Sequence, residues 1–299
     1  MLASPDDADR VLERGEAWMA LIDPRGFSAG MQAGRAQSVQ VVADGSDANS
    51  AGVSLSYATN LIAQYGQQRA ADYALAAGRR DLPVPGIQPV VRVWFNPRLE
   101  SRDFMIPGIV ALLLLVVTTN LSSMAIVREK ELGTLEQLNV TPLTRAELIV
   151  GKLLPYALVG LVDVVLVLSV AILWFHVPMR GSYVLLFGTT LIYLVATLGL
   201  GLLVSTISQT QQQAMMTTTF FFLIPMMLLS GFVFPIENMP AVVQPVTYLI
   251  PLRYFLVILR SIFLKGVGLR VLWPQVAALA TWSAAVLGLA IARSSKTTA

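Results

Sequence analysis

Residues 104–127 read FMIPGIVALLLLVVTTNLSSMAIV, a run without a single charged side chain. A helix needs roughly 20 predominantly apolar residues to cross the hydrocarbon core of a bilayer, and this run is longer than that. Backbone groups in lipid are satisfied only in helices or closed barrels, and the apolar residues here are continuous where a barrel strand would alternate. The run therefore predicts a membrane-spanning helix.

Four more segments of this kind follow, at residues 153–175, 183–207, 214–234 and 271–292. A sixth candidate, residues 246–264, differs because it contains Arg253 and Arg260. Each arginine costs about 2.5–3.5 kcal/mol at the centre of an inserted helix, and prolines divide the segment into pieces too short to span. We therefore predict five spans and, over residues 235–265, two short helices that dip into one leaflet or lie at its surface, with Pro251 starting one of them.

The composition agrees with a membrane protein and excludes several other classes. Only 13% of the residues are charged, whereas a soluble domain carries about a quarter. There is no cysteine and a single histidine, His176, which excludes disulfide scaffolds, thiol catalysis and Cys/His zinc sites. No basic stripe is interleaved with aromatic residues, so no nucleic-acid partner is expected.

The sequence contains no motif for catalysis or nucleotide binding. Gly151-Lys152 is followed by Leu153 and lacks the upstream glycine of a phosphate-binding loop. We expect no catalytic residue, no metal and no cofactor in this chain, and an interfacial structural role for His176. The N-terminal acids lack the spacing of a calcium loop and are expected to be solvated surface and turn residues: Asp6, Asp7, Asp9, Asp44 and Asp47.

The charge distribution divides the chain into a polar domain, residues 1–103, and a membrane domain, residues 104–299. Three strands are predicted in the first, at residues 17–22, 38–43 and 90–95. Residues 48–77 predict a helix, and Asp44-Gly45 predicts a turn. The fold class is therefore an α-helical membrane protein of five spans plus short re-entrant or interfacial helices, with a small α/β domain at its N-terminus.

Five spans place the two ends of the chain on opposite sides of the membrane. A slight excess of lysine and arginine favours a cytoplasmic C-terminus, which makes the N-terminal domain extracytoplasmic. Nothing before residue 104 has the apolar core of a signal peptide that would export this domain. We therefore expect the domain to be incomplete and an upstream span to be missing from the chain.

The loop between the first two spans, residues 128–152, reads REKELGTLEQLNVTPLTRAELIVGK. Gly133 offers the left-handed conformation that ends a helix. Thr134 with Gln137 forms a capping box that starts a short helix at the next residue, and a second capping box begins at Thr144. These helix-ending and helix-starting signals predict three ordered segments within residues 128–152, and we call this loop the elbow.

The elbow is also amphipathic. Its leucines fall near one face, and its other face leaves Glu129, Lys130 and Glu136 for water or a partner. The sharper interpretation is a rigid lever at the membrane surface on which another protein pushes. The alternative is an ordinary connecting loop with solvated charges.

Residues 128–138 resemble the Arg-Glu-x-Glu-x-Gly-Thr-x-Glu-Gln-Leu signature of ABC-2 type transporter permeases, most closely the bacterial multidrug-export permeases. Further matching stretches are DGSD at residues 44–47, FNP at 95–97, FMIPG at 104–108, SGFVFP at 230–235 and PLRYF at 251–255. The resemblance covers essentially the whole chain. It implies a six-span subunit of a dimeric permease, and the span that precedes the extracytoplasmic domain in that family is the one missing here.

The resemblance further implies an exporter subunit whose coupling helix, around residues 135–139, docks on a separate cytoplasmic ATPase that binds the ATP and Mg. The residues expected to serve this coupling are Arg128, Glu129, Glu131, Gly133, Thr134, Leu135, Glu136, Gln137 and Leu138. Other expected partners are a second copy or a homologous permease, membrane lipid and a periplasmic adaptor, in the bacterial inner membrane. Drugs or other amphipathic compounds are the expected cargo. Lipid or polysaccharide export, or a non-transporting sensor or assembly protein, are the alternatives.

Candidate residues for a substrate path or gate are Asp163, Met226, Gly231, Pro235, Glu237 and Arg253. Asp163 lies near the middle of the second span, where a carboxylate either binds a cation or proton or makes a polar contact between helices. The methionines and phenylalanines of the fourth span either line an apolar path or pack ordinarily. Gly199 and Gly201 permit close approach of a neighbouring helix.

Overall fold

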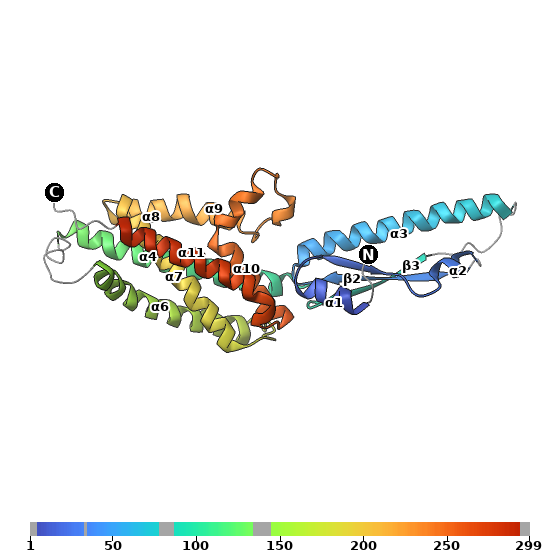
Figure 1. The fold of residues 1–299 in the computed structure, drawn as a ribbon, viewed down its shortest axis with the longest axis horizontal. Coiled ribbons are helices and arrows are strands. Elements are labelled where there is room, and N and C mark those ends of the chain that lie inside the picture. Colours follow the sequence, from blue (N-terminus) through green and yellow to red (C-terminus); the bar gives the residue numbers. More distant parts are fainter. Residues whose placement is uncertain (1–4, 33–34, 78–86, 134–144, 294–299) are drawn as a thin grey trace. The chain divides into compact units, whose positions relative to one another are not determined.

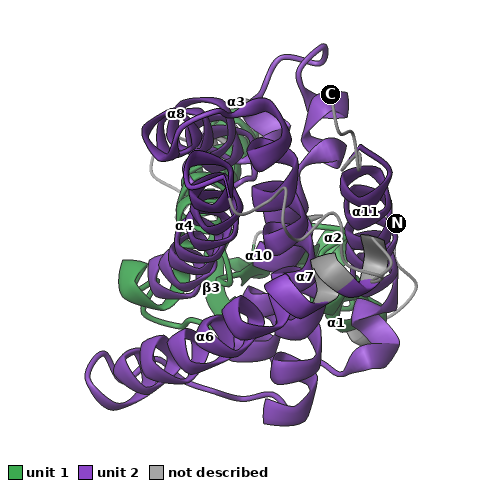
Figure 2. Ribbon diagram, turned by 90° about the vertical axis from the view of Figure 1, so that its left-hand side faces the viewer, with its two compact units in different colours: residues 1–104 green, residues 105–299 purple. Residues whose placement is uncertain are grey.

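The computed structural model describes residues 5–32, 35–77, 87–133 and 145–293. The chain divides into two compact units, Met1–Phe104 and Met105–Ala299, which Figure 2 shows in separate colours. Each unit is built from its own stretch of sequence and has its own buried residues, and each is described by itself.

The N-terminal unit is a three-stranded sheet with helices. Its elements in chain order are α1 (Pro5–Glu13), β1 (Met19–Ile22), α2 (Phe27–Gln32), β2 (Gln37–Asp44), α3 (Ala48–Ala77) and β3 (Ile87–Trp94). The strand order is β1-β2-β3, with β1 antiparallel and β3 parallel to β2. A parallel neighbour needs a long crossover, and α3 lies in this connection (Figure 1).

The packing of α3 on the sheet supplies the core of this unit. Ala58 and Ile62 of α3 are buried against Val41 of β2. The small sheet and the helix 48–77 were both predicted, and the helix has the predicted bounds. The strands lie within three residues of the predicted ones at every end, since β-branched residues mark strands better than they mark strand termini.

The second unit is a bundle of helices. Its longest elements are α4 (Ser101–Glu131), α6 (Arg145–Leu173), α7 (Tyr183–Ile207) and α11 (Leu269–Arg293). Another continuous helical stretch consists of α8 (Gln211–Thr217), the π-helical segment η1 (Thr218–Leu223) and α9 (Ile224–Leu229). These stretches provide five candidate membrane spans in the described part of the chain: Ser101–Glu131, Gly151–Leu173, Tyr183–Ile207, Gln211–Leu229 and Leu269–Arg293. The five predicted spans are confirmed.

Helix α7 occupies the centre of the bundle. Its most apolar stretch is 67% buried, against 22% for α6 and α11 and 17% for Gln211–Leu229. It packs against α6, α10 and α11. Hydroxyl groups also join it to α4: the Thr118 and Thr197 oxygens lie 2.7 Å apart, and Ser122 donates to the Leu198 carbonyl at 3.0 Å.

Glycines allow this packing, as predicted. A Cβ atom at Gly201 would lie 2.5 Å from the Thr119 carbonyl oxygen on α4. A Cβ atom at Gly199 would lie 3.2 Å from Val286 on α11. Both distances are shorter than ordinary van der Waals contact, so the helices can approach this closely because these positions have no side chain.

The region that was predicted to hold two short helices is more divided. It contains the 3₁₀ segments η2 (Ile236–Asn238) and η3 (Gln244–Leu249), then α10 (Pro251–Arg260), which a π-helical turn, η4 (Ser261–Lys265), extends. Pro251 starts α10 as predicted, and Gly266 follows η4 with φ 67°. Prolines within the preceding stretch limit helical hydrogen bonding, which leaves only short 3₁₀ segments there.

Helix α10 is not a span, yet it is among the most buried elements of the bundle. Leu252, Phe255 and Ile258 are fully buried, and α10 packs against α7 and α11. The Phe255 ring stacks on Tyr193 of α7, with centroids 4.0 Å apart and planes at 13°. Protein therefore covers this non-spanning backbone, as membrane proteins require.

Candidate functional site

The candidate site begins where α4 ends. The helix stops at Glu131, the Gly133 amide donates to the Lys130 carbonyl at 3.1 Å, and Gly133 has φ 71°. The prediction that Gly133 ends this helix in a left-handed conformation is confirmed. The next helix, α6, starts at Arg145. The predicted coupling residues Thr134, Leu135, Glu136, Gln137 and Leu138 lie outside the described residues, as does Thr144.

Glu129 joins α4 to α6. Its Oε2 atom accepts a hydrogen bond from Lys152 Nζ, and the two groups form an ion pair. Both side chains are about one quarter exposed, 32% and 21% respectively. Glu129 was expected to face water or a partner; about a third of its side chain is exposed, but its carboxylate pairs with a lysine on the neighbouring helix of the same chain.

Lys130 joins α4 to the end of α7. Its Nζ atom donates to the Ser208 carbonyl at 3.2 Å and also to the Ser205 carbonyl. Carbonyls in the last turn of a helix have no intrahelical donor and carry partial negative charge, so a lysine satisfies both needs. Lys130 was also expected to face water or a partner, but its ammonium group is bound by backbone carbonyls of the same chain.

Glu131 joins α4 to the start of α8. Its Oε1 atom accepts from the Gln211 backbone amide at 2.9 Å, and Oε2 accepts from Gln211 Nε2 at 2.5 Å. The first amides of a helix lack intrahelical acceptors and favour negative charge. Glu131 therefore caps α8 from another helix.

These three consecutive residues, Glu129, Lys130 and Glu131, form what we call the α4 hub. Successive side chains on a helix point about 100° apart, so one helix end reaches α6, α7 and α8. Two residues before the hub in α4, Val127 is buried with Val204 of α7 and Ala214 of α8. Hydrogen-bond partners 23 to 80 residues away are not visible in a local pattern. The alternation of charges directly before a helix-ending glycine does mark the place.

Arg128 is the remaining charge of this helix end, and its side chain is exposed. Its neighbours in the chain are engaged within the bundle: Val127 is buried, and Glu129 pairs with Lys152. Of the charged coupling residues that the structure describes, Arg128 is thus the one most available to a partner.

Arg253 was predicted to belong to a gate, and the structure places it in a compact polar cluster. Its guanidinium lies over the Tyr248 ring, 3.9 Å from the centroid, and donates to Thr247 Oγ1. The Tyr254 hydroxyl donates to the Tyr248 carbonyl at 2.8 Å. Burial raises the pKa of Tyr254, and Arg253 partly offsets this. This cluster links η3 to α10 around the Pro251 break.

The other predicted gate residues lie before this cluster. Met226 is buried, Gly231 has φ 82°, and Pro235 precedes η2. Glu237 is exposed, and no ion pair joins it to Arg253 in the described part of the chain. Gly231 and Pro235 follow the last helical residue of the span, as predicted. The part of these residues in a gate stays a prediction.

Asp163 lies in the middle of α6. Its Oδ2 atom is buried, and no hydrogen bond reaches it from the described residues. The alternative of a contact to a serine or threonine within the chain is therefore not realised there. Leu158, Val162 and Leu166 of the same helix are exposed by 58–61%.

Asp44 and Asp47, the predicted turn residues of the N-terminal unit, both accept hydrogen bonds from backbone amides. Asp44 Oδ1 accepts from the Ser46 amide at 2.9 Å, and Asp47 Oδ1 accepts from the Asn49 amide at 3.0 Å at the start of α3. The turn is confirmed, but both side chains are over 90% buried, so solvated surface was the wrong expectation for them. Their oxygens are occupied by backbone amides.

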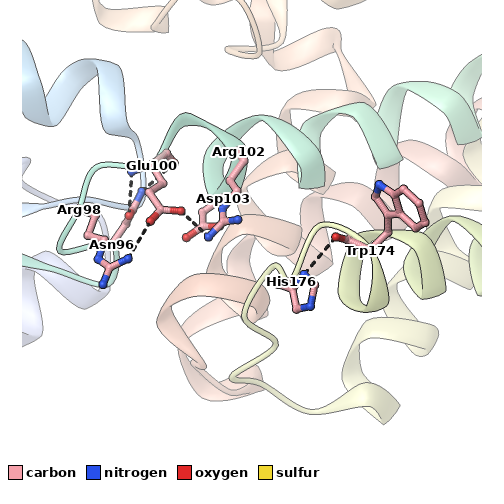
Figure 3. Close-up of polar contacts among 7 residues, drawn as sticks. All are labelled: Asn96, Arg98, Glu100, Arg102, Asp103, Trp174 and His176. Atoms are coloured by element: carbon pink, nitrogen blue, oxygen red, sulfur yellow. Dashed lines mark hydrogen bonds and ion pairs between the residues drawn. The ribbon is translucent and has the colours of Figure 1, made fainter.

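A second turn follows β3, and it leads into α4. Asn96 Nδ2 donates to the Glu100 carbonyl, and the Glu100 amide donates back to Asn96 Oδ1, both at 3.0 Å. The Glu100 carboxylate lies 3.6 Å from Arg98 Nη1 and 2.5 Å from Arg102 Nη2 (Figure 3). The Gly45 amide donates to the Trp94 carbonyl at 2.9 Å, which joins this turn to the one at Asp44.

His176 follows the end of α6, in the other unit. Its φ is 55°, and its Nδ1 atom lies 3.0 Å from the Trp174 carbonyl (Figure 3). This local contact shapes the turn after the helix. No group of three or more His, Asp or Glu side chains among the described residues is placed to hold a metal ion.

Five apolar spans, a closely packed α4–α7 seam and a charged hub at helix ends define a multi-pass helical membrane protein. Residues 2–292 match the model of the ABC-2 family transporter protein. The chain belongs to this family, as the motifs at its elbow predicted.

Three Escherichia coli proteins are similar to the chain. It is 37% identical to the probable multidrug ABC transporter permease YbhS over 85% of its own length and 66% of that protein. It is 33% identical to the probable multidrug ABC transporter permease YbhR, over 91% and 72%. It is 30% identical to the inner membrane transport permease YhhJ, over 99% and 78%. The chain thus spans about two thirds to three quarters of the length of these relatives.

Proposed function

We propose that this chain is the permease subunit of an ABC-type exporter that carries drugs or other amphipathic compounds, driven by a separate ATPase. The α4 hub carries this proposal: it is the first part of the elbow, and its residues hold α6, α7 and α8. A force applied to the elbow acts on four helices together. The names of YbhS and YbhR, which call both probable multidrug permeases, support the same class of cargo.

The proposal includes an orientation and partners. The elbow and the C-terminus face the cytoplasm of a bacterial inner-membrane protein, the N-terminal unit lies outside it, and the ATPase binds the ATP and Mg. A second permease copy or a homologue completes the path, with lipid around it and a periplasmic adaptor as a further partner. A partner changes the state of the permease only if it binds one state better than the other.

Two substitutions in the elbow test the coupling. Leu135→Asp with Leu138→Asp is expected to lower ATP-driven export by about tenfold or more, since coupling between sites is typically worth about 5–150-fold. The measurement is uptake of a fluorescent amphiphile into inverted vesicles that contain the chain and the ATPase that copurifies with it. Val242→Asp is the control, because Val242 is 86% exposed and lies between η2 and η3. Unchanged export by the double variant contradicts ATPase docking at the elbow, and the lack of any copurifying ATPase contradicts the proposed function.

Asp163 is proposed to bind positively charged cargo. A buried carboxylate oxygen without a hydrogen bond from the described residues, on a stretch of α6 that has no other charged residue after Lys152, is costly in a membrane unless a cation or proton accompanies it. Cationic drugs have the matching charge.

Asp163→Asn is therefore expected to reduce export of cationic amphiphiles about tenfold, a loss that corresponds to about 1.4 kcal/mol, and to leave neutral ones unchanged. The same vesicle uptake, run with paired cationic and neutral dyes, measures this. Ser169→Ala is the matched control on α6, because Ser169 bonds only to the Val165 carbonyl of its own helix, at 2.6 Å. Equal export of both dye classes by Asp163→Asn removes the role in binding cargo.

A further inference from the structure

We propose that Glu131 is a positioning residue that makes the start of α8 follow the end of α4 when the elbow moves. This proposal rests on the proposed function, because it concerns how motion of the elbow spreads. The span Gln211–Leu229 would then receive its motion directly from α4.

The position of Glu131 gives the first reason. It is the last residue of α4, two residues before the glycine that ends the helix, and both of its carboxylate oxygens accept hydrogen bonds from Gln211. The bonds at the carboxylate are charge-assisted and point in two directions from one side chain. They therefore fix both the distance and the orientation of the α8 start relative to α4.

The surroundings of α8 give the second reason. Gln211–Leu229 is the least buried of the five candidate spans, at 17% of its most apolar stretch. Its buried apolar contact with α4 and α7 at this end is Ala214 against Val127 and Val204, with Phe222 packed beside them. A span with so little packing moves with whatever holds its end, and Glu131 holds its first residue.

The shape of the span gives the third reason. Directly after α8, the π-helical segment η1 replaces regular helix at Thr218–Leu223. Single π turns inside helices occur frequently at functional sites. A displacement that enters at Gln211 meets this irregular segment one turn after Ala214, so it reaches η1 before α9.

Lys130 holds the end of α7, next to the start of α8 that would move. It holds the last turn of α7 through the carbonyls of Ser205 and Ser208, one residue before Glu131 reaches α8. The loop between α7 and α8 contains only Ser208, Gln209 and Thr210. The α7 end and the α8 start are therefore tied both through the chain and through α4.

The experiment compares the number of substrate molecules exported per ATP hydrolysed, in vesicles holding the permease and its copurified ATPase. Glu131→Ala is expected to lower this ratio about fivefold or more while ATP hydrolysis continues, since coupling is commonly worth about 5–150-fold. Gln211→Ala is expected to do the same. Gln212→Ala is the matched control, because the Gln212 side chain is exposed and adjacent to Gln211.

A covalent rescue separates positioning from a merely structural role. The chain contains no cysteine, so Glu131→Cys with Gln211→Cys can be joined specifically by a short bifunctional thiol reagent. Before cross-linking, the double variant is expected to show the low ratio of Glu131→Ala. After cross-linking, the ratio is expected to return to within about twofold of the original, because the reagent replaces the hydrogen-bonded connection.

The outcomes distinguish this inference from the proposed function. If the original chain with its ATPase exports nothing on addition of ATP, the proposed function fails. If it exports and Glu131→Ala keeps the original ratio, the inference about Glu131 is overturned. Loss of export on cross-linking also overturns it, because the α4 end and the α8 start would then have to separate during transport.

Discussion

Gly201→Ala is expected to destabilise the bundle strongly, because the added methyl group has no room. Its Cβ atom would lie 2.5 Å from the Thr119 carbonyl oxygen and 2.8 Å from Ser122 Cβ. The first of these atoms belongs to the backbone of α4, so relief requires the two helices to separate. Overpacking of this kind costs about 1–3 kcal/mol, and separation would also weaken the hydrogen bond from Ser122 to Leu198.

The measurement is the midpoint of thermal unfolding of the purified chain in detergent, expected to fall by about 5 °C, since each kcal/mol shifts the midpoint by about 2–4 °C at this size. Gly188→Ala is the matched control on the same helix, because nothing lies within 4 Å of its added Cβ. We expect no loss for the control. Equal midpoints for both variants would show that the α4–α7 seam tolerates a side chain and is looser than the structure has it.

Gly45→Ala is expected to have a comparable effect in the N-terminal unit. The added Cβ would lie 2.7 Å from the Trp94 carbonyl oxygen and 2.9 Å from the Asn96 carbonyl oxygen. Both oxygens are backbone atoms of the turn that follows β3, so the two turns would be forced apart. The expected loss is about 1–3 kcal/mol for this unit, together with the hydrogen bond from the Gly45 amide to Trp94.

Limited proteolysis of the whole chain reports on this unit, because cleavage tracks the population of opened protein. Gly45→Ala is expected to be cut within residues 5–94 about tenfold faster, as a loss of about 1.4 kcal/mol implies. Gly52→Ala is the control: no atom lies within 4 Å of its added Cβ, and alanine favours the interior of α3. Equal cleavage rates for the two variants would contradict the close contact of the two turns.

The sequence predicted what depends on local pattern. The length of each apolar run located the five spans, and the low content of Gly and Pro located α3 with its bounds. The left-handed end of α4 followed from the identity of Gly133. In each case a few neighbouring residues contain the whole physical cause.

The features that the sequence did not predict depend on residues far apart in the chain. Lys130 finds its carbonyl partners 75 and 78 residues later, so its charge looked available for water. The burial of Asp44 and Asp47 also depends on the packing around the turn, whereas sequence indicates only the turn itself.

The burial of α10 has a consequence for how the chain is made. Together with η4 it is shorter than the roughly 20 residues a span needs, and its covering neighbours are α7 and α11. Synthesis proceeds from the N-terminus, so a nascent chain presents α10 to the membrane before α11 exists. The surface of α10 that α11 covers is therefore completed only after Leu269–Arg293 has been made. A chain that stops before Leu269 would leave this buried helix incompletely covered.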